Sequence, residues 1–297
     1  MLLRSESAEP AHDADARLHA DERFCAEMAR REAKNFYWGF ISLPYEQRIA
    51  IYALYDLARQ VDDEADGAVP AGYDLPARLE THRARVRAAA RGEYADAIAH
   101  VLARAIERYR IPEHELQALI DGCEMDFSTN RYQTWEELRL YCNGVASVVG
   151  RMCVRIFGFD DPAALQRADD LGLALQLTNI LRDVREDAGM GRIYLPQEDL
   201  RRFGVTEDEL LTGVRSARWD ELVAFEVRRA RELFAHGYLV VRYIPRRPAV
   251  CVQTMAGIYE TILDKIERDP DLPLRGRAAL SKTEKLRVMI GSWLHAV

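Results

Sequence analysis

The sequence predicts an all-α protein built as one domain. Apolar residues recur at intervals of three and four along most of the 297 residues, whereas the alternating pattern of half-buried strands is scarce. Glycine and proline, which interrupt helices, number only 17 and 11. Neither an internal repeat nor a low-complexity linker divides the chain, so a single helical domain is the simplest interpretation.

Start and stop signals place the individual helices. The Ser-Leu-Pro segment at 42–44 is typical of a helix entrance, and the helix that follows should run to about residue 66. Glycine and proline then mark a loop up to residue 76. Further helices are predicted at about 77–92, 94–109, 113–128, 134–157, 162–188, 207–212, 215–243, 246–268 and 281–294. The run 238–241 also suits a short strand, but its place inside a long periodic stretch favours helix.

Composition excludes several classes of protein. Residues 1–20 are polar and acidic, without the apolar core of a secretory signal, so we expect a disordered tail there and one domain over 21–297. No apolar run approaches the ~18 residues that a membrane span needs. The five cysteines form no C-x-x-C pair, which predicts reduced thiols in a cytoplasmic protein. A formal net charge of −7 argues against nucleic-acid binding.

The helix predicted up to residue 66 carries acidic residues where its inward face should continue. Asp62 and Asp66 are four residues apart, so they lie one turn apart on the same face as Tyr55 and Ile51. A solvated acidic helix end is the structural alternative. Acidic groups at a helix C-terminus are, however, unfavourable with the helix dipole and call for compensation.

A second polar stripe interrupts the helix predicted over 162–188. Gln176, Asn179, Asp183 and Asp187 are spaced by 3, 4 and 4, while the rest of the segment is rich in leucine and isoleucine. Burying such groups without partners costs several kcal/mol each. The stripe must therefore face solvent, other polar groups, a metal or a wet cavity, and the apolar character of the helix favours a cavity.

Together the two helices would place four carboxylates around one space. Like charges at that distance raise each other's pKa unless cations neutralise them. Oxygen ligands favour Mg²⁺, which keeps several waters and is often shared with phosphate oxygens, and Mn²⁺ is a possible substitute. No set of histidines accompanies the aspartates, which disfavours Zn²⁺. The chemistry indicated is metal-assisted handling of a diphosphate.

The segments YALYDLARQVDDEAD and LALQLTNILRDVREDAGMGRIYLP resemble the two aspartate-rich motifs of the squalene/phytoene synthase family. Further matches are NFYWGFISLP, MDFSTNRY, YCNGVASVVGRMCVRIFG, IYETILDKIE and LSKTEKL, so the resemblance spans roughly residues 22–293. It implies an all-α isoprenoid synthase fold around a central cavity. It also implies head-to-head joining of two prenyl diphosphates, with a cyclopropyl diphosphate as the first product.

Within that family the sequence is most similar in look to bacterial presqualene diphosphate synthases of hopanoid pathways. These condense two farnesyl diphosphates, in some cases onward to squalene with NADPH. A phytoene synthase, which condenses two geranylgeranyl diphosphates for carotenoids, is the alternative. NADPH use is left open, because the sequence has no dinucleotide fingerprint and this fold would not use one. A relative that has lost catalysis and acts as an assembly factor should have lost the aspartates, which are present here.

The resemblance also assigns roles to single residues. The metal ligands would be Asp62, Asp66, Asp183 and Asp187. The catalytic candidates are Tyr55, Arg59, Tyr141 and Tyr259. The substrate-binding candidates are Asn35, Phe36, Val145, Val149, Gly150, Gln176, Asn179 and Arg182. Guanidinium groups suit diphosphate oxygens, tyrosine rings stabilise carbocations, and an apolar wall excludes the water that would quench them.

Each assignment has a structural alternative. The tyrosines and apolar residues are equally compatible with an ordinary core, Gly150 with close helix packing, and Arg182 with a surface ion pair. Asp126 either faces the cavity or caps its own helix. The family's N-terminal serine pattern is replaced here by Ala33-Lys34-Asn35-Phe36, so only Asn35 can still donate a hydrogen bond. Because the substrates and products are lipids, we also expect contact with a membrane surface or with pathway enzymes, although no strongly amphipathic basic helix is evident.

Overall fold

The computed structural model describes residues 11–33, 36–66 and 74–295, apart from the side chains of 11–14, 65, 66 and 295. Within those ranges the chain is helical, and its only β-type pairing is a lone bridge between Arg131 and Ile193. The all-α prediction is confirmed. The helices α1 to α8 are Ala11–Glu32, Tyr37–Phe40, Tyr45–Asp66, Leu75–Ala90, Ala97–Tyr109, Glu113–Ser128, Trp135–Cys142 and Val148–Phe157. The helices α9 to α15 are Ala163–Gly189, Gln197–Phe203, Glu207–Thr212, Trp219–Gly237, Arg246–Arg268, Leu272–Arg275 and Lys282–His295.

Helix starts follow local capping chemistry. The side chains of Asp74, Asp96 and Thr134 accept hydrogen bonds from backbone N–H groups in the first turns of α4, α5 and α7. Thr206 and Glu209 form a reciprocal capping box at α11. Such side chains satisfy N–H groups that the helix cannot pair internally, which is why the predicted starts agree closely with the structure.

The structure departs from the sequence-based helices in several places, and α1, α2, α10 and α14 were not among the predicted helices. Helix α1 begins at Ala11, inside the segment expected to be a tail. The predicted 134–157 helix contains a π-helical turn, η1 (Asn143–Ser147), between α7 and α8. The predicted 215–243 helix is α12 followed by a 3₁₀ segment, η2 (Tyr238–Arg242), so the strand alternative for 238–241 is wrong and the chain there remains helical.

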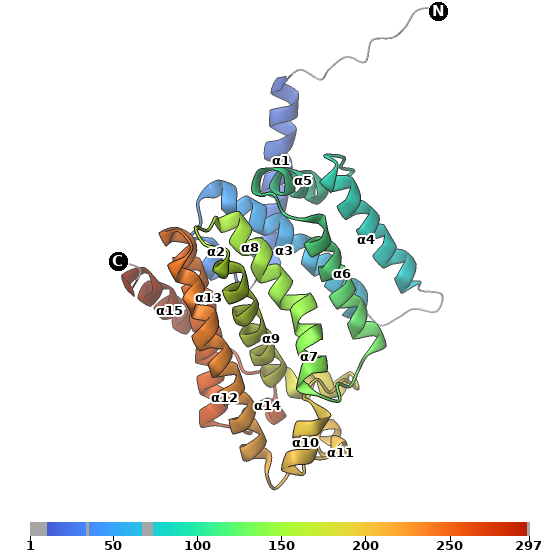
Figure 1. Cartoon of the computed structure of the whole chain (residues 1–297), viewed down its shortest axis with the longest axis vertical. Coiled ribbons are helices and arrows are strands. Elements are labelled where there is room, and N and C mark those ends of the chain that lie inside the picture. The colour runs from blue at the N-terminus through green and yellow to red at the C-terminus, as the bar shows by residue number, and fades with distance from the viewer. Residues whose placement is uncertain (1–10, 34–35, 67–73, 296–297) are drawn as a thin grey trace, which may run out of the picture.

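Helix α9 runs through the middle of the bundle, between α7 and α8 on one side and α12 and α13 on the other (Figure 1). Two glycines permit this close packing. A Cβ on Gly172 would lie 2.7 Å from Ser147 Cα, and one on Gly237 would lie 2.5 Å from Leu171 N. The polar stripe predicted on α9 is therefore surrounded by other helices, and its position depends on all of them.

All five cysteines are free thiols, four of them buried, as the sequence predicts. No described helix has the length and apolar character needed to cross a membrane.

Candidate functional site

A hollow enters the bundle between α3, α6, α8, α9 and α13, and its lining changes from polar to apolar with depth. Gln176 and Asn179 line both the mouth and the deep end, so the two parts form one continuous space. The mouth is lined mainly by charged and polar side chains, and the deep chamber almost wholly by apolar ones. This polarity gradient suits a ligand with a charged head and an apolar tail.

The polar stripe of α9 lines the mouth as predicted. Gln176, Asn179, Asp183 and Asp187 all border it, and Asp62 of α3 borders it as well. The helical spacing of 3, 4 and 4 is what aligns the four α9 side chains. The predicted partners Asp66 and Asn35 lie outside the described side chains, so their position relative to the mouth stays a prediction.

The two α9 aspartates have contrasting environments although they are one turn apart. Asp183 is held by the adjacent Arg182, with Nε–Oδ1 at 2.8 Å and Nη2–Oδ2 at 2.5 Å, and by Arg277 Nε at 3.2 Å. Asp187 is largely buried, and burial together with the charge of Asp183 raises its pKa to about 7, despite the opposing effect of Arg192. A cation near Asp187 would relieve this cost.

Across the mouth, Arg59 holds the acidic end of α3. Its guanidinium contacts Asp62 Oδ2 at 3.0 Å and Asp63 Oδ1 at 2.5 Å, and all three side chains are about half exposed. The resemblance made Arg59 a diphosphate contact and Asp62 a metal ligand, and both side chains line the mouth. An arginine paired with carboxylates at an open surface can exchange them for diphosphate oxygens.

The donor set at the mouth fits Mg²⁺ in its chemistry. Carboxylate and amide oxygens dominate the possible ligands there, and the buried Oδ1 of Asn179 has no hydrogen-bond partner. Within the described part of the chain, no three acidic, histidine or cysteine groups stand close enough to cage an ion on their own. Oxygen donors that lie apart suit an ion that completes its shell with water and phosphate oxygens.

Asp126 joins two tyrosines at the same mouth. Tyr141 donates to Asp126 Oδ2 at 2.9 Å, and Tyr194 donates to Oδ1 at 2.7 Å. Burial and the negative charge of Asp126 raise the pKa of both hydroxyls well above the ordinary value for tyrosine. Asp126 therefore faces the site rather than capping its own helix, and both tyrosines remain protonated donors at neutral pH.

Sequence reasoning did not single out Tyr194, Arg192 or Arg277, all of which line the mouth. The bridge between Arg131 and Ile193 holds the segment after α9 against the segment after α6, which brings Tyr194 beside Asp126. Tyr194 belongs to the GRIYLP segment that carried the family resemblance, and this was the available signal.

Tyr55 lines the hollow beside Phe36, whereas Tyr259, which was also expected to line it, is buried behind Phe36 and is not among the lining residues. The ring of Phe36 is 5.9 Å from that of Tyr259 and 6.2 Å from that of Tyr55, measured between centroids. Burial raises the pKa of both tyrosines, to about 12 for Tyr55, while hydrogen bonding with Arg182 opposes the shift at Tyr259. Arg182 is buried, which excludes the surface ion pair considered from sequence. Stacked rings beside a cavity can stabilise a passing cation.

The deep chamber contains the predicted apolar residues Val145, Val149 and Gly150. A Cβ on Gly150 would lie 2.9 Å from the carbonyl oxygen of Ala168, so Gly150 also permits the close approach of α8 and α9. Gly150 thus lines the chamber and also permits close helix packing, and its contact with a substrate tail stays a prediction. The chamber is completed by Phe36, Phe40, Ala146, Cys153, Val154, Phe157, Ala168, Leu171, Gly172, Leu175, Val240, Val252 and Met255, next to Gln176 and Asn179.

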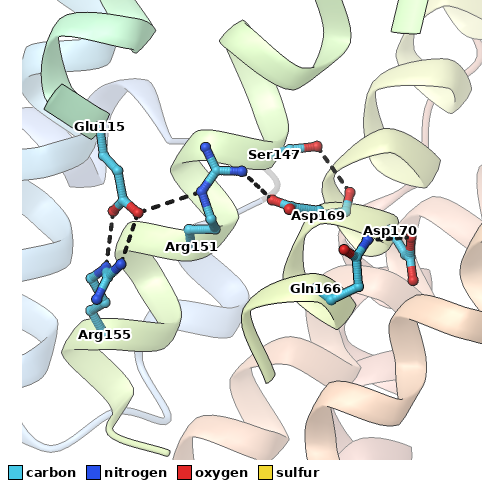
Figure 2. Close-up of polar contacts among 7 residues, drawn as sticks. All are labelled: Glu115, Ser147, Arg151, Arg155, Gln166, Asp169 and Asp170. Atoms are coloured by element: carbon cyan, nitrogen blue, oxygen red, sulfur yellow. Dashed lines mark hydrogen bonds and ion pairs between the residues drawn. The ribbon is translucent and has the colours of Figure 1, made fainter. Parts of the chain in front are cut away.

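Behind this wall, ion pairs fix α8 against its neighbours (Figure 2). Glu115 of α6 is buried and accepts two 3.0 Å hydrogen bonds from Arg155. Arg151 contacts Glu115 at 3.4 Å and Asp169 of α9 at 2.5 Å, and Ser147 donates to the Asp169 carbonyl. Gly150 and Ala168 form the close contact between α8 and α9, and Arg151 and Asp169 are the residues that follow them in the chain. The Arg151–Asp169 ion pair therefore helps to set the distance between α8 and α9 in the chamber wall.

Comparison with known proteins places this fold and site in a class. The squalene/phytoene synthase family model matches residues 29–284. The chain is 35% identical to the 15-cis-phytoene synthase of a Synechocystis strain, over 100% of this chain and 91% of that protein. It is also 35% identical to the phytoene synthase of Mycobacterium tuberculosis, over 90% and 88%.

Solved structures of similar proteins share the fold of this chain. Squalene synthase HpnC from Alicyclobacillus acidocaldarius superposes with a TM-score of 0.80 at 31% identity, over 85% of this chain and 95% of that one. A dehydrosqualene synthase in complex with ligand gives 0.85 at 26%, over 94% and 97%.

The chain is thus a prenyltransferase with an isoprenoid synthase fold. It belongs to the squalene/phytoene synthase family, which condenses prenyl diphosphates head to head and is typically Mg²⁺-dependent.

Proposed function

We propose that this protein is a phytoene synthase, which condenses two geranylgeranyl diphosphates. The observation that carries the proposal is the similarity along nearly the whole chain to relatives named phytoene synthase, at 35% identity. This differs from the preference for presqualene diphosphate synthases that the sequence motifs suggested. The two aspartate-rich motifs line the mouth around the charged heads, so they carry little information about tail length.

In this proposal the mouth holds the two diphosphates. Arg59 and Arg182 supply guanidinium groups, and Gln176 and Asn179 supply amides. Asp62, Asp66, Asp183 and Asp187 would hold Mg²⁺, which when bound would supply positive charge against the leaving diphosphate. The allylic carbon–oxygen bond breaks with its electron pair going to the diphosphate. The double bond of the second substrate attacks the resulting cation, and loss of a proton closes the cyclopropane ring.

The tyrosines act around the cation rather than as bases in their ionised form. Tyr141 and Tyr194 are protonated and each donates its single hydroxyl proton to Asp126, so together they fix the Asp126 carboxylate at the mouth. Phe36 and Tyr55 present rings to the hollow where a cation would pass toward the chamber, and Tyr259 packs against Phe36 from behind. Val145, Val149 and Gly150 form part of the wall for the tail, and their apolar surface excludes water from the cation.

A farnesyl-specific enzyme is the second candidate. It is favoured by the two structures named squalene synthase and dehydrosqualene synthase, which share the fold at 31% and 26% identity. The two candidates differ in the length of the tail that the chamber must take. NADPH would be required only if the farnesyl product is squalene, because phytoene and dehydrosqualene form without a reductant.

The test is product analysis with each labelled substrate and Mg²⁺, with and without NADPH. Phytoene from geranylgeranyl diphosphate without NADPH supports the proposal. Turnover of farnesyl diphosphate alone would replace it with the second candidate. Asp183→Asn should abolish turnover, whereas Asp208→Asn, an exposed aspartate of α11, is the matched control and should retain it. Full activity of the Asp183 variant would refute the metal assignment.

A further inference from the structure

The last helix, α15, exposes an apolar face that no described part of the chain covers. Leu286, Ile290, Trp293 and Leu294 recur at helical spacing, and all are exposed, from 37% for Trp293 to 70% for Leu294. Large apolar side chains gathered on one exposed helix face mark an interaction surface. We call these four residues the α15 face.

The opposite side of α15 packs tightly on the bundle. It lies beside α13 in Figure 1. A Cβ on Gly257 of α13 would lie 2.8 Å from Val288, and Ser292 is buried. Helix α15 also contacts α2. Phe40 of α2 and Met255 of α13 line the deep chamber, so α15 covers two of the helices that form its wall.

The charges of α15 complement an anionic surface. Residues 282–294 contain three basic side chains, Lys282, Lys285 and Arg287, in a protein whose net charge is −7. Their single acid, Glu284, is engaged by Lys265 Nζ at 2.9 Å and by the backbone N–H of Ser281. The exposed apolar face is therefore flanked by positive charge and carries no acid of its own.

We propose that the α15 face docks on an anionic membrane surface. Apolar residues with a tryptophan, flanked by lysine and arginine, are typical of helices that lie in the headgroup region. The family's substrates carry apolar tails, and its condensed products are more apolar still, so the enzyme must exchange them with a bilayer. Docking through α15 would bring the helices of the chamber wall to that bilayer. A second copy of the chain fits this surface less well, because pairing two α15 faces would bring their basic flanks together.

Vesicle flotation tests the proposal without any turnover, so failure of the proposed substrate assignment would not affect it. The vesicles are phosphatidylcholine alone, and phosphatidylcholine with about one third phosphatidylglycerol. The double variant Ile290→Ser/Leu294→Ser should lose at least about tenfold in partitioning to the mixed vesicles, since two apolar side chains no longer enter the lipid. The matched control, Phe24→Ser/Val214→Ser, removes two exposed apolar residues elsewhere and should bind as the wild type does.

Two further measurements separate the electrostatic from the apolar contribution to vesicle binding. Lys282→Glu/Arg287→Glu should weaken binding to the mixed vesicles by about tenfold or more and leave binding to phosphatidylcholine unchanged. The emission of Trp293, taken as the difference from Trp293→Phe, should shift to shorter wavelength on binding. Equal binding by wild type and the Ile290/Leu294 variant would overturn the proposal. The proposal would also be overturned if the wild type did not bind vesicles but instead self-associated or captured a protein, and the Ile290/Leu294 variant abolished that association.

Discussion

Replacing Asp187 with asparagine should stabilise the metal-free protein while abolishing turnover. Burial and the charge of Asp183 raise the pKa of Asp187 from 3.8 to about 7. At 1.36 kcal/mol for each pKa unit, keeping this group ionised in the fold costs up to about 4 kcal/mol. Asparagine has the same shape and no charge but still requires desolvation, so we expect a net gain of about 1–3 kcal/mol at pH 8.

The sign of the pH dependence follows from the direction of the shift. Because the pKa of Asp187 is higher in the folded than in the unfolded chain, the cost is absent below about pH 4 and complete above about pH 7. The gain in the free energy of unfolding from Asp187→Asn should therefore fall to less than half at pH 5. Urea unfolding in EDTA at the two pH values measures it, and at pH 8 the melting temperature should rise by about 2–10 °C.

Asp183→Asn provides the matched control one turn away. Asp183 is paired with the buried Arg182 and with Arg277, so removing its charge leaves a buried guanidinium without its carboxylate. That variant should lose about 1–3 kcal/mol under the same conditions. The reasoning is refuted if Asp187→Asn is less stable than the wild type at pH 8 in EDTA, or if its effect is the same at both pH values.

Three further substitutions test other parts of the site. Tyr194→Phe removes one of the hydrogen bonds to Asp126 and should lower kcat by about tenfold or more with little change in melting temperature; unchanged kinetics would exclude Tyr194 from the reaction. Gly150→Ala should cost about 1–3 kcal/mol in urea unfolding, because its new methyl group meets a carbonyl oxygen at 2.9 Å; wild-type stability would contradict the close packing. Glu115→Gln should cost about 2–3 kcal/mol by separating the bidentate pair with Arg155, and a loss under 0.5 kcal/mol would show that the pair is solvated.

Periodicity and capping residues were sufficient to predict most of the fold. The stripe of α9 was predictable because four polar residues in an otherwise apolar helix have a spacing that only a helix can align. The predicted limits of α6, α11 and α13 match the structure because proline, threonine and glycine stand at their ends. Short helices such as α2 and α14 were missed, since four residues carry too little periodic signal.

What the sequence could not predict depends on contacts between distant segments. Tyr194 lies 68 residues from Asp126, and only the packing of two loops brings them together. The α15 face was missed for a different reason. The same short helix also has apolar residues such as Val288 directed at α13, so the sequence shows apolar side chains on both sides and no clear amphipathic pattern.

The ion network of Arg151 and Asp169 explains how the chamber wall can contain a close contact between two helices while the chamber itself stays open. Gly150 and Ala168 bring α8 and α9 close together with almost no side chain between them. Small residues alone would leave this contact easy to shift, but the next residue on each helix, Arg151 and Asp169, forms an ion pair with the other (Figure 2). The spacing of the wall is thus set by charges outside the chamber, and its interior need not be filled to hold the helices in place. It follows that the length of tail accepted depends on the size of the side chains that line the chamber, rather than on movement of α8.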